Sequence, residues 1–290
     1  MTANHGWPYF QNVSSDTVTS NPERCKAFHR LHASGCFVIP NPWDVGSARA
    51  LARLGFAALA TTSSGFAWSL GRPDNGVSLD EALAHIRSIV QSVDVPVSAD
   101  FEGGFGIAPA EVAANVARAT ATGLAGLSIE DSTGDGSHPL FDFALAVERI
   151  QAARQAIDES GTGALLTGRS EGFIVGRPDL AETIRRLTAY AEAGADCLFA
   201  PGIRTRHDIV AVVSAVSPKP VNVLVGGSFA TLDELREMGV RRISVGGALA
   251  RTAWTGFLQA AREIAERGSF ASLDHAITFN ELNQSFRTDT

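Results

Sequence analysis

Acidic side chains end two apolar segments of the sequence, at spacings that could bring them together. Asp100 and Glu102 end the segment VPVSADF, and three glycines follow at once in EGGFG. Glu130 ends a later segment, AGLSIE. Side chains two residues apart on a strand point to the same side. If the two segments form neighbouring strands, three carboxylates meet at one edge of a sheet.

Three carboxylates without a cation between them repel one another and take up protons. A hard divalent cation removes that repulsion, and oxygen-rich sites suit Mg²⁺ or Mn²⁺. We therefore predict a metal site of Asp100, Glu102 and Glu130, with Mg²⁺ as the cofactor and Mn²⁺ as the alternative. The glycines after Glu102 would let the backbone approach the ion or its ligand closely. The other interpretation is that each acid caps a helix or pairs with Lys or Arg.

Further polar residues follow other apolar segments. Arg169 ends LLTGR and could hold a carboxylate or phosphonate through two hydrogen bonds, or could instead form a structural salt bridge to Glu171 or Glu130. The segment TTSSG, residues 61–65, offers hydroxyl and amide groups that could hold an anion. Plain loops use the same residue types, so this segment alone is weak evidence.

The elements that would position these residues alternate along the chain. From residue 36, eight short apolar segments typical of strands alternate with stretches of helical spacing. In SLDEALAHIRSIVQSV, for example, Ser78 and Glu81 fit a capping box at the start of a helix. Strands that are apolar on both faces indicate a parallel sheet covered by helices. Eight such units favour an α/β fold of the closed (β/α)₈ TIM-barrel type, with an open doubly wound sheet as the alternative, and a barrel carries its chemistry at the C-terminal ends of its strands.

Composition narrows the classes of function. The net charge of −7, without a basic cluster, argues against a nucleic-acid partner. No run of 18 apolar residues is present, which argues against a membrane span. The first ten residues, MTANHGWPYF, lack the order of a signal peptide. The cysteines Cys25, Cys36 and Cys197 are odd in number and lack metal-site spacing, so we expect a cytoplasmic protein without a disulfide framework or a structural zinc site.

In their order and spacing, these motifs resemble those of the isocitrate lyase/phosphoenolpyruvate mutase superfamily. The resemblance covers about residues 36–285 and is carried by NPWDVGSARALARLGFAALATTSSG, SLGRPD, SADFEGGFG, AGLSIEDS, LLTGRSEG, YAEAGADCLFAPG and LREMGVRRISVGGAL. It implies a (β/α)₈ barrel whose last helix is swapped between subunits, and hence a homodimer or homotetramer. We expect a single domain over residues 1–290. Its barrel with an N-terminal helix would span about residues 22–268, and a swapped helical extension about residues 269–290.

The resemblance also implies Mg²⁺ and a substrate with a pyruvate-like or enolpyruvate-like core. Matched residue by residue, Asp100 is the direct metal ligand, and Glu102 and Glu130 hold the metal through waters. Catalytic roles are implied for Asp74, which would support the neighbouring loop, and for Arg169, which would bind the substrate carboxylate. The substrate-binding residues implied by the match are Trp43, Thr61, Thr62, Ser63, Arg169 and Asn222.

The sequence departs from the superfamily pattern where the reaction is decided. The pattern D-x-D-x-G-[YF]-G has Glu102 in place of its second Asp and Gly103 as the spacer. The lyases carry a loop with K-[KR]-C-G-H after the fourth strand, and its Cys transfers the proton. Here residues 131–143 read DSTGDGSHPLFDF, without Cys, Lys or Arg. His138 is the one remaining acid/base candidate of this loop near neutral pH, and we assign it a catalytic role.

We therefore predict a Mg²⁺-dependent lyase that cleaves a C–C bond in a small 2-oxo or 2-hydroxy di- or tricarboxylic acid through a metal-stabilised enolate. The substrate would be oxaloacetate-like, a substituted malate or methylisocitrate-like. One alternative is a P–C bond enzyme, a phosphonomutase or phosphonopyruvate hydrolase, which the absence of Lys and Arg in the loop disfavours. The other is a non-catalytic binder of 2-oxo acids. A His138 that folds over the ligand would favour catalysis, and one that points to solvent would favour binding alone.

Overall fold

Eight short parallel strands form the centre of the fold in a computed structural model that describes residues 21–287. The first ten residues, in which we predict no signal peptide, lie outside the described residues. The strands are β1 (Phe37–Ile39), β2 (Leu59–Ala60), β3 (Val97–Asp100), β4 (Gly126–Glu130), β5 (Leu165–Arg169), β6 (Cys197–Phe199), β7 (Val221–Leu224) and β8 (Arg242–Ser244).

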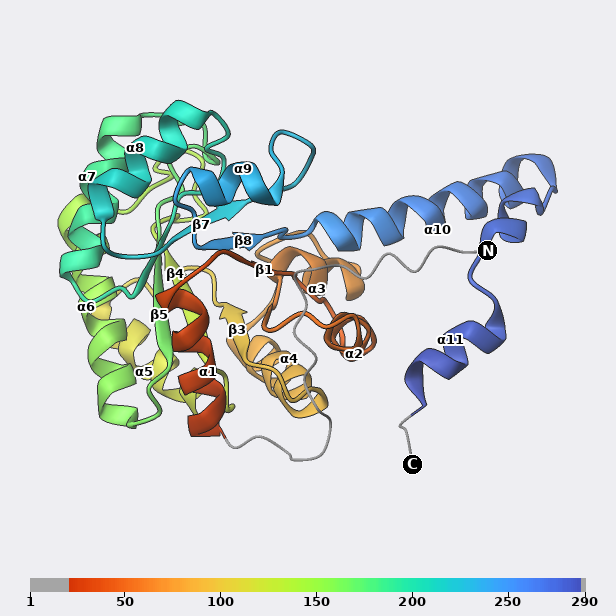
Figure 1. Cartoon of the computed structure of the whole chain (residues 1–290), viewed down its shortest axis with the longest axis horizontal. Coiled ribbons are helices and arrows are strands. Elements are labelled where there is room, and N and C mark those ends of the chain that lie inside the picture. The colour runs from red at the N-terminus through yellow and green to blue at the C-terminus, as the bar shows by residue number, and fades with distance from the viewer. Residues whose placement is uncertain (1–20, 288–290) are drawn as a thin grey trace.

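Helices connect the strands and surround them (Figure 1). The helices are α1 (Asn21–Ala33), α2 (Val45–Arg53), α3 (Ser63–Ser69), α4 (Leu79–Ser92), α5 (Pro109–Thr120), α6 (Phe143–Ser160), α7 (Leu180–Glu192), α8 (Arg206–Val216), α9 (Leu232–Glu237), α10 (Ala248–Arg267), the 3₁₀ helix η1 (Ala271–His275) and α11 (Phe279–Phe286). The predicted capping box is confirmed, because Ser78 and Glu81 cap α4 reciprocally.

The strand order shows that the sheet curls into a barrel. Hydrogen-bonded neighbours run β1-β8-β7-β6-β5-β4-β3-β2, and every pair is parallel. The two end strands also approach each other, since the amide of Ala60 donates to the carbonyl of Pro40 at 3.1 Å. A doubly wound sheet would reverse its strand order near the middle. The nearly closed barrel therefore confirms the predicted (β/α)₈ TIM-type fold.

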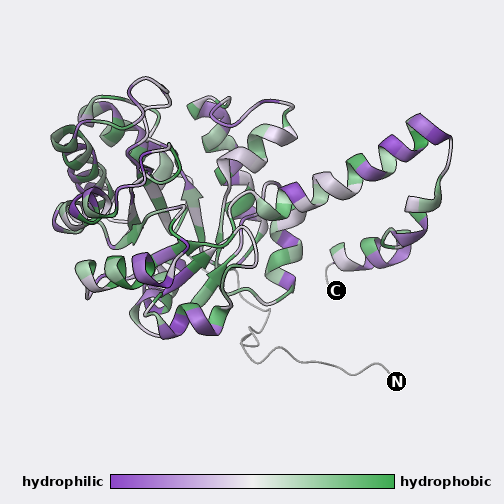
Figure 2. Cartoon of the chain, turned by 90° about the horizontal axis from the view of Figure 1, so that it is seen from above, coloured by the Kyte–Doolittle hydropathy of each residue, from purple (hydrophilic) through white to green (hydrophobic). Residues whose placement is uncertain are grey.

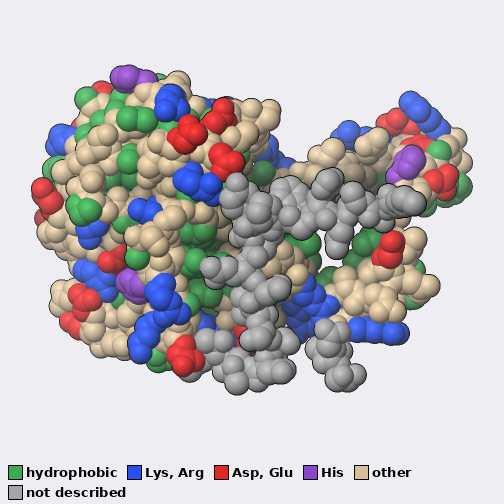
Figure 3. Space-filling model, viewed as in Figure 1, with side chains coloured by type: hydrophobic (Ala, Val, Ile, Leu, Met, Phe, Trp, Pro, Cys, Tyr) green, Lys and Arg blue, Asp and Glu red, His purple; other side chains and the backbone are tan. Residues whose placement is uncertain are grey.

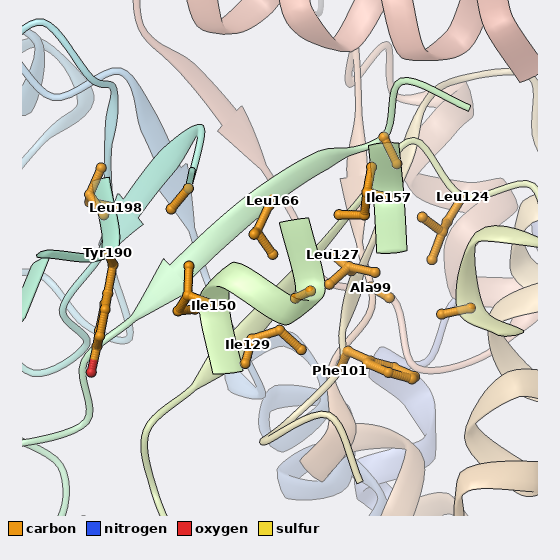
Figure 4. Close-up of a cluster of buried hydrophobic side chains, with 14 of the residues drawn as sticks. Ala99, Phe101, Leu124, Leu127, Ile129, Ile150, Ile157, Leu166, Tyr190 and Leu198 are labelled. Carbon is orange, nitrogen blue, oxygen red and sulfur yellow. The ribbon is translucent and has the colours of Figure 1, made fainter. Parts of the chain in front are cut away.

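Buried side chains fill the layer between the strands and the helices. Figure 4 shows part of this layer, where Leu127 and Ile129 of β4 lie near Ile150 of α6 and Leu166 of β5. A smaller cluster lies where α1 packs on the strands, and Phe28 at its centre is fully buried. The cysteines are free thiols: Cys25 and Cys197 are buried and Cys36 is half-buried.

The C-terminal helices leave the barrel as an arm, defined here as α10, η1 and α11 (Figures 1 and 2). Ala250 is the one buried residue of α10, whereas a helix that covers a barrel buries a whole face. The end of α11 lies near α2, where Arg53 donates to the carbonyl of Arg287 at 2.6 Å. The arm exposes large apolar side chains, among them Trp254, Phe257, Phe270, Leu273, Ile277 and Phe279. Swapping of this arm and the predicted domain limits stay predictions.

The visible surface carries both signs of charge. In Figure 3, acidic and basic side chains are intermixed over the barrel and do not form a continuous basic patch on this face. No helix within residues 21–287 is long and apolar enough to cross a membrane.

Candidate active site

The predicted acids and Arg169 lie at the C-terminal ends of three adjacent strands. Asp100 is the last residue of β3, Glu130 of β4 and Arg169 of β5. The strand register places Glu130 directly beside Arg169. Glu102 follows β3, and its carbonyl accepts the amide of Glu130 at 3.0 Å. The fold thus gathers residues that lie far apart in the sequence.

Asp100 is held by the segment that follows β2. Its Oδ2 accepts hydrogen bonds from the amide of Ser63 at 3.0 Å and from the Ser63 hydroxyl at 2.9 Å. Its own amide donates to the hydroxyl of Thr61 at 3.0 Å. The Ser63 hydroxyl also lies 3.4 Å from Asp74. Thr61, Ser63 and Asp74 therefore meet Asp100 as one hydrogen-bonded group.

Arg169 is shared by carboxylates of three strand ends. Its Nη1 lies 3.2 Å from Asp100 Oδ1 and 3.1 Å from Glu130 Oε2. Its Nε donates to Glu171 in a very short contact. The Arg169 guanidinium also lies 5.2 Å from the ring centre of Phe199, at the end of β6. Of the two interpretations made for Arg169, the salt bridges are the one that this structure displays.

Negative charge exceeds positive charge in this cluster, and burial amplifies the imbalance. Burial raises the pKa of Glu102 from 4.5 to about 7, with further upward contributions from Asp100 and Asp74. Burial raises the pKa of Glu130 well above its usual value, although Arg169 acts against it. The pKa of Asp74 is also raised, by burial and by the nearby Asp100. The carboxyls compete for a single guanidinium.

The carboxylates of Asp100, Glu102 and Glu130 fit a hard divalent cation, because their oxygens are the ligands that such ions prefer and Arg169 alone does not balance their charge. Within residues 21–287, however, no three acidic, His or Cys side chains converge closely enough to hold one ion between them. The guanidinium of Arg169 lies between Asp100 and Glu130 and keeps those two carboxylates apart. The chain could therefore offer one direct carboxylate ligand, with other acids acting through water.

The loop EGGFG has a packing reason for its glycines. A Cβ atom at Gly103 would stand 3.1 Å from Nη2 of Arg149, and one at Gly104 would stand 3.1 Å from Val112. Arg149 is fully buried on α6 and donates to the carbonyl of Ile107 at 2.8 Å and to that of Gly103. We expected these glycines to bring the backbone close to an ion. In this structure they bring it close to α5 and α6.

Asp131 holds Glu171, one of the carboxylates that contact Arg169, in place. It is 2 % exposed, and its Oδ1 accepts the amide of Glu171 at 2.8 Å. Its Oδ2 accepts the hydroxyl of Tyr190 at 2.6 Å and Nη1 of Arg186 at 3.2 Å. Tyr190 is labelled in Figure 4, where its oxygen points away from the apolar side chains. Because Glu171 holds Arg169, this network sets the position of the guanidinium.

Three other predicted site residues lie in different surroundings. Thr62 caps α3, where its hydroxyl accepts the amide of Gly65 at 3.3 Å. Trp43 is half-buried just after β1, and its carbonyl accepts a hydrogen bond from Nε2 of His85 at 2.9 Å. Asn222 is buried on β7, and both ends of its amide are bonded to side chains of β8.

His138 points to solvent in this structure. Its side chain is 86 % exposed, and its ring contacts Asp135 and Ser137 of its own loop. The loop is itself held together, since Ser132 pairs with Leu140 across it. A catalytic role for His138 would therefore require the loop to change position.

Arg149, Asp131 and Tyr190 are site-supporting residues that the sequence reasoning did not assign. Asp131 carried a weak signal, because it is an acid directly after a strand end. Arg149 and Tyr190 sit on helices, α6 and α7, where an amphipathic pattern does not reveal what a buried polar group contacts.

Comparison with known proteins agrees with this geometry. A family model of phosphoenolpyruvate phosphomutase matches residues 28–265. The chain belongs to the isocitrate lyase/phosphoenolpyruvate mutase superfamily. The resemblance drawn from the motifs is thus confirmed, as is the expectation of an enzyme of this superfamily.

Members of the superfamily resemble the chain over half to about nine-tenths of its length. A crystal structure from Burkholderia cenocepacia J2315, of a protein inferred to be a lyase or mutase, is 47 % identical with a TM-score of 0.90 and covers 93 % of this chain and 98 % of its own. The structure of 2,3-dimethylmalate lyase is 28 % identical with a TM-score of 0.80 and covers 93 % and 95 %. The 2-methylisocitrate lyase of Escherichia coli K12 is 35 % identical over 157 residues, 52 % of each chain.

Proposed function

We propose that this protein is a divalent-metal-dependent lyase that cleaves a C–C bond in a small 2-oxo or 2-hydroxy di- or tricarboxylic acid. The observation that carries the proposal is the sharing of Arg169 by the carboxylates of Asp100, Glu130 and Glu171 at the C-terminal ends of the strands. Such an excess of acid suits a divalent cation, and the cation together with Arg169 would then supply the positive charge that an anionic oxo acid needs.

The chain's own residues divide the work of binding. Asp100 is the proposed direct ligand of Mg²⁺ or Mn²⁺, and Glu102 and Glu130 are its proposed supports through water. When bound, such an ion supplies positive charge that stabilises the enolate left by bond cleavage. Arg169 is the proposed partner of the substrate carboxylate. The amide and hydroxyl of Ser63 donate hydrogen bonds to Asp100 and so fix the Asp100 carboxylate relative to the substrate pocket.

The remaining substrate residues follow from the superfamily match. Thr61, Thr62 and Ser63 are proposed to receive the carboxylate and carbonyl of the oxo acid, with Asp74 supporting their segment through Ser63. Trp43 and Asn222 are proposed to line the same pocket. In this structure Asn222 is bonded to β8, so a contact with substrate would replace one of those hydrogen bonds.

Relatives support a carbon acid as the substrate. Two of them are named lyases of 2,3-dimethylmalate and of 2-methylisocitrate, both of which are substituted di- or tricarboxylic acids. An oxaloacetate-like substrate also remains within the proposal, because its cleavage demands less of the loop at residues 131–141. That loop carries no Lys or Arg, which a phosphonate with its extra charge would require, so we rank P–C chemistry lower.

A non-catalytic binder of 2-oxo acids is the second candidate, and one observation favours it. His138, the acid/base candidate of the loop, is exposed to solvent and contacts only side chains of its own loop among the described residues. A lyase needs a proton donor or acceptor near the carbon that loses its bond. A binder needs only the strand-end residues.

We also propose that the protein works as a homodimer or homotetramer through a swapped arm. The exposed apolar side chains of α10, η1 and α11 support this, because a monomer in water gains nothing by exposing them. Phe279 alone is 81 % exposed.

Product release followed by NMR tests the function. Oxaloacetate, 2-methylisocitrate, isocitrate, dimethylmalate and phosphonopyruvate would each be supplied with Mg²⁺, with and without EDTA. We expect pyruvate or glyoxylate from a carbon acid, and its loss with EDTA. Phosphate from phosphonopyruvate would instead assign P–C chemistry, and oxo-acid binding without any product would assign a binder.

The variant Asp100→Ala tests the metal assignment. It should abolish turnover and Mg²⁺-dependent binding of the oxo acid, whereas Asp80→Ala should leave both unchanged. Asp80 is a suitable control because its side chain is 83 % exposed on α4 and forms a surface salt bridge with Arg118. Retention of Mg²⁺-dependent binding in Asp100→Ala would show that the metal lies elsewhere.

A further inference from the structure

The loop EGGFG, which follows β3, has a strained backbone. Glu102 has a φ of 47° and Phe105 a φ of 54°, values in the left-handed region that residues with a Cβ atom seldom adopt. Such a conformation persists only where surrounding contacts hold it, and it often marks a functional site. The φ of Glu102 also sets the direction in which its side chain leaves the backbone. The contacts of this loop therefore decide where the Glu102 carboxyl lies.

Arg149 on α6 holds three carbonyls of this segment. Its Nη1 donates to Gly106 at 2.5 Å and to Ile107 at 2.8 Å, and its Nη2 donates to Gly103 in a very short contact. Arg149 is 1 % exposed, and within residues 21–287 no carboxylate forms an ion pair with it. A buried guanidinium is ordinarily matched by an acid. Here the backbone of the loop takes the place of that acid.

Asn115 and Glu130 hold the remaining carbonyls of the loop. Asn115 is half-buried on α5, and its Nδ2 donates to Gly104 at 3.0 Å and to Phe105 at 3.1 Å. The amide of Glu130 donates to the carbonyl of Glu102 at 3.0 Å. Every carbonyl of the loop is therefore bonded to a group of another element. Such complete pairing can maintain a backbone that would otherwise relax.

The guanidinium of Arg149 also packs on the loop after β4. It lies 3.9 Å from the ring centre of Phe141, a distance at which a cation is attracted to an aromatic face. Phe141 is itself fixed, because its amide donates to the carbonyl of Asp131 at 2.9 Å and its carbonyl accepts Nη1 of Arg186 at 3.0 Å. One buried cation therefore joins the loops that follow β3 and β4.

We propose that Arg149 and Asn115 are positioning residues that hold Glu102 where it supports the metal. The proposal rests on the proposed function, in which Glu102 acts on the ion through water. Both side chains act through the loop backbone rather than through contact with the ion or the substrate. Replacement of a residue that orients a metal-supporting group typically lowers metal affinity about ten- to a hundredfold.

Amide hydrogen exchange of the metal-free full chain tests whether these side chains hold the loop. Arg149→Lys keeps the charge but cannot span three carbonyls, and Asn115→Ala removes two hydrogen bonds at a half-buried position that the fold tolerates. In both variants, the peptide of residues 101–108 should exchange at least about tenfold faster. Arg154→Lys is the matched control, because Arg154 lies on the same helix and instead pairs with Asp196 at 3.0 Å. It should leave this peptide unchanged.

Mn²⁺ binding, followed by EPR without substrate, tests the consequence for the metal. The Kd for Mn²⁺ should rise roughly tenfold or more in Arg149→Lys and should also rise in Asn115→Ala, whereas Arg154→Lys should bind Mn²⁺ as the wild type does. In a Glu102→Gln background, Arg149→Lys should have little further effect, because Arg149 acts through Glu102. A general loss of stability would not produce this dependence on Glu102.

Two results would overturn the proposal while leaving the proposed function in place. One is an unchanged exchange rate of the loop peptide in both variants. The other is a wild-type Mn²⁺ affinity in variants whose loop exchanges faster, because the loop would then not position Glu102 for the metal. A wild-type protein that binds no Mn²⁺ would overturn the proposed function, and this proposal with it.

Discussion

Glu102 should make the metal-free protein less stable as the pH rises through neutrality. Its pKa is raised from 4.5 to about 7, first by burial and then by Asp100 and Asp74. A carboxyl whose pKa is higher in the folded state holds its proton more tightly there than in the unfolded chain. Its contribution to stability is therefore complete below pH 4.5 and is lost as the pH rises to about 7.

The size of the loss follows from the two pKa values. A rise from 4.5 to about 7 corresponds to a decrease in the free energy of unfolding of about 3 kcal/mol between pH 4.5 and pH 8. Glu130 and Asp74 also have raised pKa values, so they change the stability of the wild type in the same direction. The difference between the wild type and Glu102→Gln isolates the contribution of Glu102, because the amide does not titrate.

Urea unfolding in EDTA measures this difference. Relative to the wild type, Glu102→Gln should gain about 3 kcal/mol of stability on going from pH 4.5 to pH 8. The matched control is Glu237→Gln, an exposed carboxyl at the end of α9, whose stability should follow the wild type at both pH values. Added Mg²⁺ should stabilise the wild type at pH 8 more than it stabilises Glu102→Gln.

Parallel curves for the wild type and Glu102→Gln would refute the reasoning. Such a result would mean that the Glu102 carboxyl is fully solvated or finds a cationic partner, so that ionisation carries no penalty. Equal stabilisation of both proteins by Mg²⁺ would separately remove Glu102 from the metal site.

Three further substitutions test the site and its support. Tyr190→Phe removes the 2.6 Å hydrogen bond to Asp131 and should lower the free energy of unfolding by roughly 1.5–3 kcal/mol, measured with urea; an unchanged midpoint would show that water replaces the hydroxyl. Arg169→Lys loses the planar guanidinium that three carboxylates share, so kcat/KM should fall at least about tenfold, and an unchanged value would assign the substrate carboxylate to another group. His138→Ala should lower kcat about a hundredfold with KM unchanged if the loop brings this ring to the substrate. Unaffected turnover would show that another residue transfers the proton.

The strand ends were predictable because one geometric rule governs them. Residues at the C-terminal ends of parallel strands share an edge, and the apolar segments before Asp100, Glu130 and Arg169 mark those ends in the sequence. The nearly closed barrel followed from the count of strand-like segments and their helical spacers. These inferences needed only local patterns and the register that connects them.

The supporting contacts were not predictable in the same way. Arg149 and Tyr190 lie on helices, and the sequence does not show which loop carbonyl or carboxylate their polar atoms reach across the fold. The sequence of the loop EGGFG suggests a close approach to a ligand, yet Gly103 and Gly104 pack closely against Arg149 and Val112. The sequence also does not show that α10 leaves the barrel and exposes its large apolar side chains.

If Arg169 binds a substrate carboxylate as proposed, its hydrogen bonds explain how one guanidinium serves both an acid-rich site and an anionic substrate. Its Nε donates to Glu171, whose amide donates to Asp131, and Asp131 in turn accepts the hydroxyl of Tyr190. Its Nη1 is the nitrogen shared by Asp100 and Glu130. When another positive charge satisfies those two carboxylates, Nη1 becomes available to a substrate carboxylate while Nε keeps the guanidinium in position. The contact of Nε with Glu171, rather than that of Nη1 with Asp100 and Glu130, is then the part of the site that must be rigid. Loss of the Tyr190 hydroxyl should therefore weaken substrate binding, because it loosens Asp131 and, through it, Glu171.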